Sequence, residues 1–210
     1  MNATKRRILL VNPNVTGAIT DVMIAEARTS ADDRTELIAA TAAFGTIYVE
    51  NRVEAAIAAH AVLDAVAPHA RDIDGVIVSA FGDPGVEAVR ELLDVPVTGI
   101  SESAFLTAHL LGRRHVVVCL TKRLGIWYRE CAEHYGLDGR IVAVRALDVP
   151  PADITQAREE CAQQLLALCQ RAVRDDGAEV IIMGGGPVAG LARELVDDIE
   201  VPILDGVSCA

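Results

Sequence analysis

Two glycine-rich turns are the parts of this chain whose residue types and spacing point most directly to chemistry. The first, Phe81-Gly82-Asp83-Pro84-Gly85, follows the apolar run Val76–Ala80, and the second, Gly184-Gly185-Gly186-Pro187, follows Val180–Met183. Each turn precedes a segment of helical pattern, where free backbone N–H groups and the helix dipole can hold an anion or a carbonyl oxygen. A carboxylate or ureide oxygen fits such a turn, although a single glycine turn also serves simply as a tight connection. Neither turn matches a nucleotide-binding motif.

The loop Asn12-Pro13-Asn14 is a further candidate for ligand contact, because it ends the first apolar run with two amide side chains and a rigid turn. Asn14 either caps the helix that follows or faces a ligand. Thr121-Lys122 occupies the corresponding place in the second half of the chain. We therefore expect Asn14, Thr121 and Lys122 to face the ligand, together with Gly45 of the loop Phe44-Gly45-Thr46.

Few side chains are placed like a catalytic acid, base or nucleophile. The candidates are Asp83, Ser79 and Thr121, with Cys209 as an additional thiol. Asp83 stands beside Pro84, where a carboxylate more often caps a helix than transfers a proton. The other cysteines fall in strand or helix patterns and are expected in the core: Cys119, Cys131, Cys161 and Cys169. No cysteine or histidine spacing fits a metal site, so no metal is expected.

The elements that must position these residues alternate between short apolar runs and segments of helical period, which is typical of βαβ units and a mainly parallel sheet. Eight strands are predicted, at Ile8–Asn12, Glu36–Thr41, Gly75–Ala80, Val97–Ile100, His115–Leu120, Ile141–Ala146, Val180–Met183 and Ile203–Asp205. Helices are predicted to begin near Thr16, Glu50, Gly85, Ser101, Lys122, Thr155, Val188 and, for a short terminal helix, Val207.

The chain also contains an internal duplication. DGVIVSAFGDPGVEAVRELLDVPVTGIS from Asp74 matches AEVIIMGGGPVAGLARELVDDIEVPILDGVS from Ala178, and RRILLVNPN from Arg6 matches RRHVVVCLT from Arg113, at an offset of about 105 residues. The fold class predicted is α/β, with two pseudosymmetric half-domains over residues 1–100 and 101–210, mainly parallel sheets and room for crossing helices. Because ligands bind at the carboxyl ends of parallel strands, the site is expected in the cleft between the halves.

Composition limits the classes of partner. Hydrophobic residues make up 51% of the chain and aromatic residues only 3%, which suits helices of Ala, Val, Leu and Ile on parallel strands. The formal net charge of -11 disfavours nucleic acid and acidic membrane surfaces. No signal sequence or disulfide pattern is evident, so a cytoplasmic location and a small-molecule partner are expected.

The motifs together resemble a known family. The opening ILLVNPNVT, the turn SAFGDPG, the stretch PVTGISESAFLTAHLLGRR and the ending VPILDGVS are similar to the hydantoin racemases of the aspartate/glutamate racemase superfamily. The resemblance implies two pseudosymmetric halves, a homo-oligomer, no cofactor and no metal. It also implies a small carboxylate or cyclic ureide held between the halves, in contact with the turn residues Ala80, Phe81, Gly82, Gly185, Gly186 and Pro187.

In such racemases two cysteines flank the substrate, one removing a proton and the other returning a proton to the opposite face. Ala80 and Gly185 stand where the resemblance places these cysteines, and neither can transfer a proton. The first hypothesis is therefore an isomerase or lyase that uses other groups in the same cleft. The second is a non-catalytic binding or regulatory homologue. An engineered change at Ala80 would leave Gly185 unexplained.

Overall fold

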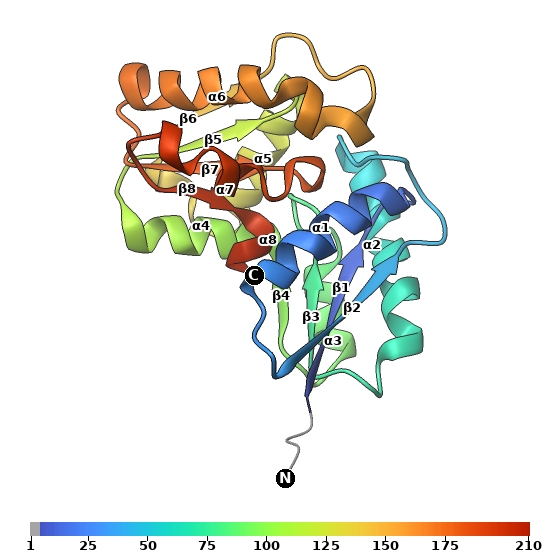
Figure 1. Cartoon of the computed structure of the whole chain (residues 1–210). Coiled ribbons are helices and arrows are strands. Elements are labelled where there is room, and N and C mark those ends of the chain that lie inside the picture. Colours follow the sequence, from blue (N-terminus) through green and yellow to red (C-terminus); the bar gives the residue numbers. More distant parts are fainter. Residues whose placement is uncertain (1–4) are drawn as a thin grey trace.

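The computed structural model describes residues 5–210, in which strands and helices alternate along the chain (Figure 1). The amino-terminal half contains β1 (Arg6–Asn12), α1 (Gly17–Ser30), β2 (Thr35–Thr41), α2 (Arg52–Val66), β3 (Gly75–Val78), α3 (Val86–Leu92), β4 (Val97–Gly99) and α4 (Ile100–Leu111). The carboxyl-terminal half contains β5 (His115–Cys119), α5 (Lys122–His134), β6 (Ile141–Ala146), α6 (Ala157–Asp176), β7 (Val180–Gly184), α7 (Leu191–Glu194), β8 (Ile203–Asp205) and α8 (Gly206–Cys209). Short 3-10 helices lie at Ala67–His69, Asp138–Arg140, Ile154–Gln156, Gly186–Val188 and Val196–Asp198.

The strands form two four-stranded sheets with the same internal order. The first sheet runs β2-β1-β3-β4 and the second runs β6-β5-β7-β8, and every pairing is parallel. The duplicated order puts β1 and β5 at equivalent central positions, and β3 and β7 beside them. The predicted fold class is confirmed: the carboxyl ends of β3 and β7, which carry the two glycine turns, are the equivalent ligand edges of the two sheets.

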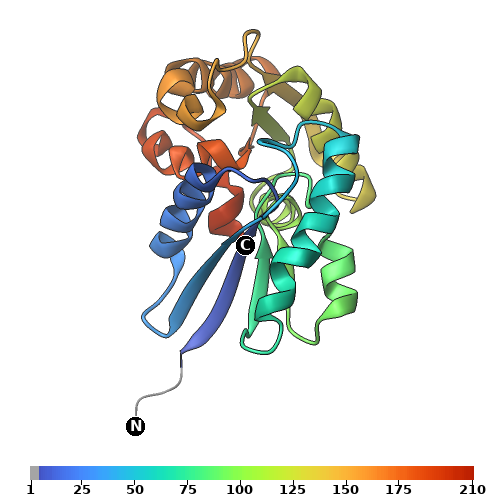
Figure 2. The same ribbon diagram turned by 90° about the vertical axis from the view of Figure 1, so that its right-hand side faces the viewer.

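Both faces of the first sheet are covered, as parallel sheets require. Leu9 and Val11 of β1 pack with Val62 and Val66 of α2 in one buried cluster. Leu10, on the opposite face, belongs to a larger cluster that includes α1 and most of the carboxyl-terminal half. Figure 2 shows α1 and α2 on opposite sides of this sheet. The alternation along β1 therefore divides its side chains between a local core and a core shared by the two halves.

Two helices pass between the halves. Helix α4 follows the first sheet in sequence but packs against β7 and α5 of the second half, whereas α8 follows the second sheet and packs against α1 and α4 (Figure 1). The chain thus crosses twice between the halves. These crossings fix how the ends of β3 and β7 face each other.

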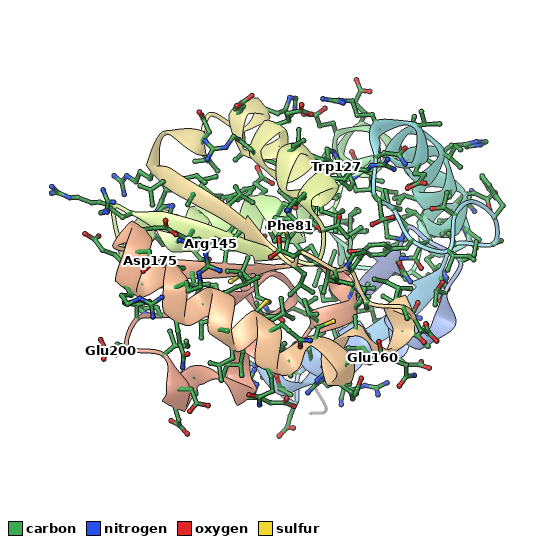
Figure 3. All side chains as sticks on the ribbon, turned by 90° about the horizontal axis from the view of Figure 1, so that it is seen from above. Phe81, Trp127, Arg145, Glu160, Asp175 and Glu200 are labelled. Carbon is green, nitrogen blue, oxygen red and sulfur yellow. The ribbon has the colours of Figure 1, made fainter. Side chains whose placement is uncertain are left out.

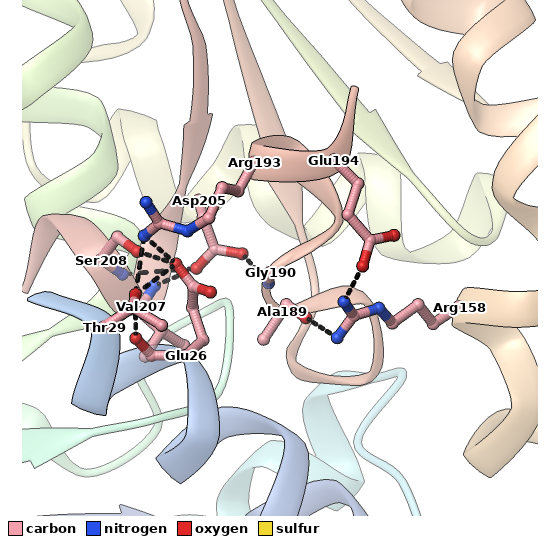
Figure 4. Close-up of polar contacts among 10 residues, drawn as sticks. All are labelled: Glu26, Thr29, Arg158, Ala189, Gly190, Arg193, Glu194, Asp205, Val207 and Ser208. Atoms are coloured by element: carbon pink, nitrogen blue, oxygen red, sulfur yellow. Dashed lines mark hydrogen bonds and ion pairs between the residues drawn. The ribbon is translucent and has the colours of Figure 1, made fainter. Parts of the chain in front are cut away.

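Polar contacts reinforce the junction of the halves on the side of α1. The carboxylate of Glu26 on α1 accepts a hydrogen bond from Arg193 on α7 at 2.7 Å and another from the Ser208 hydroxyl on α8 (Figure 4). Arg193 also donates to the Thr29 hydroxyl at 2.7 Å. Glu26 is buried, and these donors lower its pKa despite the opposing effect of burial. Its carboxylate is therefore held ionised across the junction.

The opposite flank carries exposed ion pairs. Arg52 at the start of α2 pairs with Glu130 on α5, and Glu87 on α3 lies 2.7 Å from the imidazole of His134 at the end of α5. All four side chains are more than one-third exposed, so each pair contributes little to stability.

Small differences separate the expected elements from the observed ones. Strand β3 ends at Val78 rather than Ala80, because Ser79 and Ala80 already belong to the turn. The helix expected near Val188 begins at Leu191, after a 3-10 turn that starts at Gly186. In the part of the chain that the structure describes, no helix combines the length and apolar character needed to cross a membrane.

Candidate functional site

A narrow cavity lies between the ends of β3 and β7, where the two glycine turns meet. We call it the cleft pocket and define it by its lining residues: Asn14, Ile19, Tyr48, Val49, Ser79, Ala80, Phe81, Tyr128, Gly185, Gly186 and Pro187. Its volume is about 10 Å³, which is the space of roughly one water molecule. An organic ligand therefore requires the walls of the pocket to move apart.

Ala80 and Gly185 both line this pocket, one from each half. Val78 of β3 and Met183 of β7 are the last residues that pair with β4 and β8, and Ala80 and Gly185 each come two residues later. The family resemblance assigns catalytic cysteines to these two positions. The structure places a methyl group at one of them and no side chain at the other.

Four backbone N–H groups of the paired turns are available at the pocket. Within residues 5–210, the N–H groups of Ala80, Phe81, Gly185 and Gly186 donate to no backbone or side-chain acceptor. Two come from each half, and all four residues line the cleft pocket. Buried oxyanions are stabilised by preorganised donors of this kind.

Gly82, which was expected beside these donors, has a different position. Its N–H donates to the Ser101 hydroxyl at 2.5 Å, and a Cβ atom at Gly82 would overlap the Trp127 ring. Figure 3 shows Trp127 near Phe81, where α5 covers the turn. Phe81 faces the cleft pocket, while Gly82 lines a separate surface groove on the far side of the turn. The structure does not place Gly82 at the cleft pocket.

Asp83, expected as the first catalytic candidate, is committed to a structural role. It has a left-handed backbone conformation, with φ of 48°, and its buried carboxylate accepts hydrogen bonds from the N–H groups of Ser101 at 2.9 Å and Glu102 at 2.8 Å. The Tyr135 hydroxyl donates to the same group at 3.2 Å. The carboxylate thus caps α4, although Asp83 lies well before this helix in the sequence. It does not line the cleft pocket. Burial outweighs these hydrogen bonds and raises the pKa of Asp83 to about 6.

Asp205 has the equivalent capping role in the second half, at the start of α8. It belongs to β8 at the position where β4 has Gly99, and it accepts from the N–H groups of Val207 and Gly190 at 2.8 and 2.7 Å. A side chain at Gly99 would collide with Asp83. The two halves therefore place a carboxylate at the same helix start from different sequence positions.

Ser79 lines the cleft pocket, but its hydroxyl is only weakly activated. It donates to the thioether sulfur of Met23 at 3.0 Å, and this sulfur is a weak acceptor. Among the lining residues of the cleft pocket there is no carboxylate, imidazole, amine or thiol. Ser79 therefore has no adjacent base of the kind that activates a nucleophilic hydroxyl.

Thr121, Lys122 and Gly45 lie outside the cleft pocket. The Thr121 side chain caps α5 by accepting from the Leu124 N–H at 3.2 Å. The Lys122 ammonium pairs with Asp148 at 3.0 Å and lines another surface groove. Gly45 lies against the side chain of Ile57 on α2. The structure does not bring these three expected ligand contacts to the glycine turns.

The cysteines are equally remote. Cys119, Cys131, Cys161 and Cys169 are buried in the core, as expected. Burial raises the pKa of Cys119 to about 12, and its thiol donates to the Thr121 carbonyl at 3.3 Å. Cys209 is half-buried on α8 and does not line the cleft pocket. In residues 5–210 no cluster of three or more metal-ligating side chains is found.

Two tyrosines that the sequence did not single out line the pocket beside Gly185. A Cβ atom at Gly185 would lie 3.5 Å from the Tyr48 hydroxyl and 3.7 Å from the Tyr128 hydroxyl. The Tyr48 hydroxyl is buried beside the Tyr128 hydroxyl and has no other hydrogen-bond partner in the described chain. Burial raises the pKa of both phenols well above the ordinary value, so both stay neutral and can donate. The loop after β2 was expected to contact the ligand, but nothing in the sequence distinguished Tyr48 from Phe44, Gly45 or Thr46.

Comparison with known proteins gives the family of the chain. The family model for Asp/Glu/hydantoin racemases matches residues 8–210. This chain belongs to the Asp/Glu/hydantoin racemase family. A hydantoin racemase of Pseudomonas sp. (strain NS671) is 29% identical over 202 residues, which are 96% of this chain and 81% of that protein.

Solved structures of the family share its architecture. The allantoin racemase from Klebsiella pneumoniae matches with a TM-score of 0.93 and 34% identity, covering 98% of this racemase-family chain and 84% of that chain. The allantoin racemase from Pseudomonas fluorescens matches with a TM-score of 0.90 and 35% identity, covering 97% and 86%. The resemblance seen in the sequence motifs is confirmed at the level of the family.

Proposed function

We propose that this racemase-family protein is a cofactor-independent isomerase or lyase that acts on a small carboxylate or cyclic ureide in the cleft pocket, with groups other than thiols at Ala80 and Gly185. The observation that carries the proposal is the convergence of unpaired donors from both halves on one pocket. They are the N–H groups of Ala80, Phe81, Gly185 and Gly186 and the hydroxyl of Tyr48. Buried donors normally have hydrogen-bond partners, so donors without a partner at a pocket favour a ligand that supplies the acceptors.

The chemistry of the lining supports an oxygen-rich, compact ligand. Every donor at the pocket is neutral, and no lining side chain carries a positive or negative charge. The carbonyl oxygens of a cyclic ureide or the oxygens of a carboxylate match such donors without a counter-ion. The names of the relatives, hydantoin racemase and allantoin racemase, point to the same class of substrate.

The same donors favour an enolate. When a bond at the carbon next to a carbonyl breaks, negative charge develops on the carbonyl oxygen, where these N–H and O–H groups stabilise it. Proton removal from that carbon needs a base within about 3 Å, and of the proposed catalytic residues only Ser79 lines the pocket. Loss of carbon dioxide from a malonate-type acid needs no base: the electron pair of the broken C–C bond passes to the enolate, which then takes a proton from water.

The alternative is a binding or regulatory homologue that keeps the pocket without turnover. The absence of a base from the cleft pocket is the observation that favours it. The cytoplasmic location and assembly as a homo-oligomer also remain proposals, which rest on composition and family resemblance respectively.

The experiment is a turnover panel. The purified protein is incubated with enantiopure hydantoins, allantoin, amino acids and substituted malonates, and products are separated on a chiral column and scanned by mass. A matched pair of variants locates the reaction: Ala80→Leu fills the cleft pocket, whereas Ala167→Leu adds the same atoms to the exposed face of α6.

Turnover of a ureide or carboxylate that Ala80→Leu abolishes and Ala167→Leu retains supports the proposal. Turnover that survives Ala80→Leu contradicts the location. Binding of the panel without any conversion favours the regulatory alternative.

A further inference from the structure

Helix α4 has apolar side chains on both its inner and its outer face. The inner face packs against β7, α5 and α8. The buried apolar residues of this face are Ile100, Ala104, Phe105 and Ala108. A surface helix usually has one apolar stripe and a polar opposite face, and a helix that is apolar all round is enclosed on all sides. The outer face of α4 therefore calls for a partner.

The outer face carries three exposed leucines. Leu110 is 86% exposed, Leu111 is 52% exposed and Leu106 is 49% exposed. Leu106 and Leu110 follow Ser103 at spacings of three and four residues, so these three residues form one stripe along the helix, which we call the α4 seam. Single exposed leucines are common at protein surfaces. A stripe at this spacing is typical of the contact between two packed helices.

The α4 seam lies apart from the site of the proposed chemistry. Helix α4 lies on the outside of the carboxyl-terminal half (Figure 1), and no residue of the seam lines the cleft pocket or the grooves described above. A ridge of side chains on a helix fits the surface of another macromolecule better than it fits a small molecule, which binds in a hollow.

The carboxyl end of α4 is cationic on a protein whose formal net charge is -11. The Arg140 guanidinium donates to two carbonyls at this end, at 2.9 and 3.2 Å, and Arg113 is exposed beside it. Glu179 is an acidic neighbour here and accepts from the Arg113 N–H at 2.6 Å. At the other end of the helix, the Glu102 carboxylate pairs with Arg90.

We propose that the α4 seam is a contact between two copies of this chain, packed antiparallel about a two-fold axis. Leu106 of each copy then faces Leu110 of the other, as a two-fold interface requires. The Glu102 end of one helix lies opposite the Arg113 end of the other, whereas a parallel pair would bring the two Arg113 side chains together. The inference goes beyond the proposed function, because it needs no turnover, and it gives the expected homo-oligomer a defined face.

Size and charge both favour a second copy as the occupant. Helix α4 has 12 residues and is therefore about 18 Å long, so it forms the centre of an interface of standard size, which buries about 800 Å² per copy. The charged groups at its two ends then form the polar rim. An acidic membrane surface fits less well, since the net charge of the protein repels it.

The test is sedimentation-velocity ultracentrifugation at pH 7 over a series of protein concentrations. Leu110→Glu places a charge in the centre of the seam. Ile126→Glu is the matched control, because Ile126 is an apolar residue of α5, 64% exposed, outside the seam. Arg113→Glu tests the rim, and its control is Arg123→Glu at an exposed position in the first turn of α5. Circular dichroism and urea unfolding confirm that each variant is folded.

We expect the unmodified protein, Ile126→Glu and Arg123→Glu to form pairs, or larger assemblies built from pairs. Leu110→Glu should weaken the pairing by at least on the order of 30-fold, as expected for a central anchor of an interface. Arg113→Glu should weaken it by roughly threefold to tenfold, because rim charges contribute less. Leu110→Ala adds no charge, so it replaces Leu110→Glu if that variant does not fold, and it should weaken the pairing in the same direction.

Two results would overturn the proposal. One is an unmodified protein that stays monomeric up to millimolar concentration. The other is equal behaviour of the variants at Leu110 and Ile126, which would show that the contact between copies does not use the α4 seam. Neither result bears on the proposed function, which the turnover panel tests separately.

Discussion

The backbone at Gly185 predicts that even a methyl group there destabilises the protein. Gly185 has φ of 130° and ψ of 130°, a conformation that residues with a side chain rarely adopt. Space is not the obstacle, because a Cβ atom would lie 3.5 Å or more from its nearest neighbours, which is ordinary contact. The cost of Gly185→Ala is therefore that of the backbone conformation, about 1–3 kcal/mol. For a chain of this length that corresponds to a fall in Tm of roughly 2–12 °C.

The assay is urea and thermal unfolding at pH 7, followed by circular dichroism. The matched control is Gly17→Ala, at the first residue of α1, where a Cβ atom meets nothing within 4 Å and the backbone conformation is ordinary. We expect Gly17→Ala to be neutral or slightly stabilising. Equal stabilities of Gly185→Ala and the unmodified protein would refute the reasoning. The same cost applies to Gly185→Cys, so a thiol at this position requires the turn to change its shape.

Three further changes test the surroundings of the pocket. Gly99→Ala adds a methyl group that displaces the Asp83 carboxylate from the start of α4. We expect the free energy of unfolding in urea to fall by roughly 2–4 kcal/mol. An unchanged midpoint would contradict the close contact between Gly99 and Asp83. Burial raises the pKa of Asp83 to about 6 in the folded protein, against an ordinary value of 3.8, so its contribution to stability falls by about 3 kcal/mol as the pH rises from 3 to 7. Asp83→Asn should remove this slope from a series of urea curves. Burial lowers the pKa of His115, so the unfolded chain binds the proton at a higher pH than the folded protein does. Stability should therefore fall as the pH drops below about 6.5. If this sign is right, the stability of His115→Gln should depend less on pH over the same range.

Much of the fold could be predicted because its signals are local. The strands Ile141–Ala146 and Ile203–Asp205 were predicted with the bounds that the structure has, because each is a short run that contains apolar residues and lies between turn segments. The duplication supplied the equivalence of β3 and β7, and so the meeting of Ala80 and Gly185. The crossing of α4 and α8 depends on packing between the halves, which local patterns do not encode.

The site was harder to predict because hydrogen bonds across the fold decide which polar groups remain free. Asp83 and Lys122 have residue types that serve in catalysis or binding. In the structure the Asp83 carboxylate accepts from backbone N–H groups of α4, and the Lys122 ammonium pairs with Asp148. Tyr48 had no distinguishing neighbours in sequence, and only the fold places its hydroxyl beside Gly185. Asn14 was predicted as either a cap or a ligand contact; its Oδ1 accepts from the Thr16 N–H, and the residue also lines the cleft pocket.

Exchange of the hydrogen at the asymmetric carbon of a hydantoin tests the central claim most directly, namely that the cleft pocket lacks a base because Ala80 and Gly185 stand where the family resemblance places thiols. An enantiopure 5-substituted hydantoin in deuterium oxide is followed by proton NMR with the unmodified protein, with Ala80→Cys, with Ala80→Cys combined with Gly185→Cys, and with no protein. Each general acid or base group contributes on the order of 100-fold to 10,000-fold. We predict that the unmodified protein exchanges slowly, close to the rate without protein, and that fast exchange appears when the thiols are introduced. Fast exchange by the unmodified protein would contradict the claim that no base serves the cleft pocket, because a group other than a thiol would then remove the proton there.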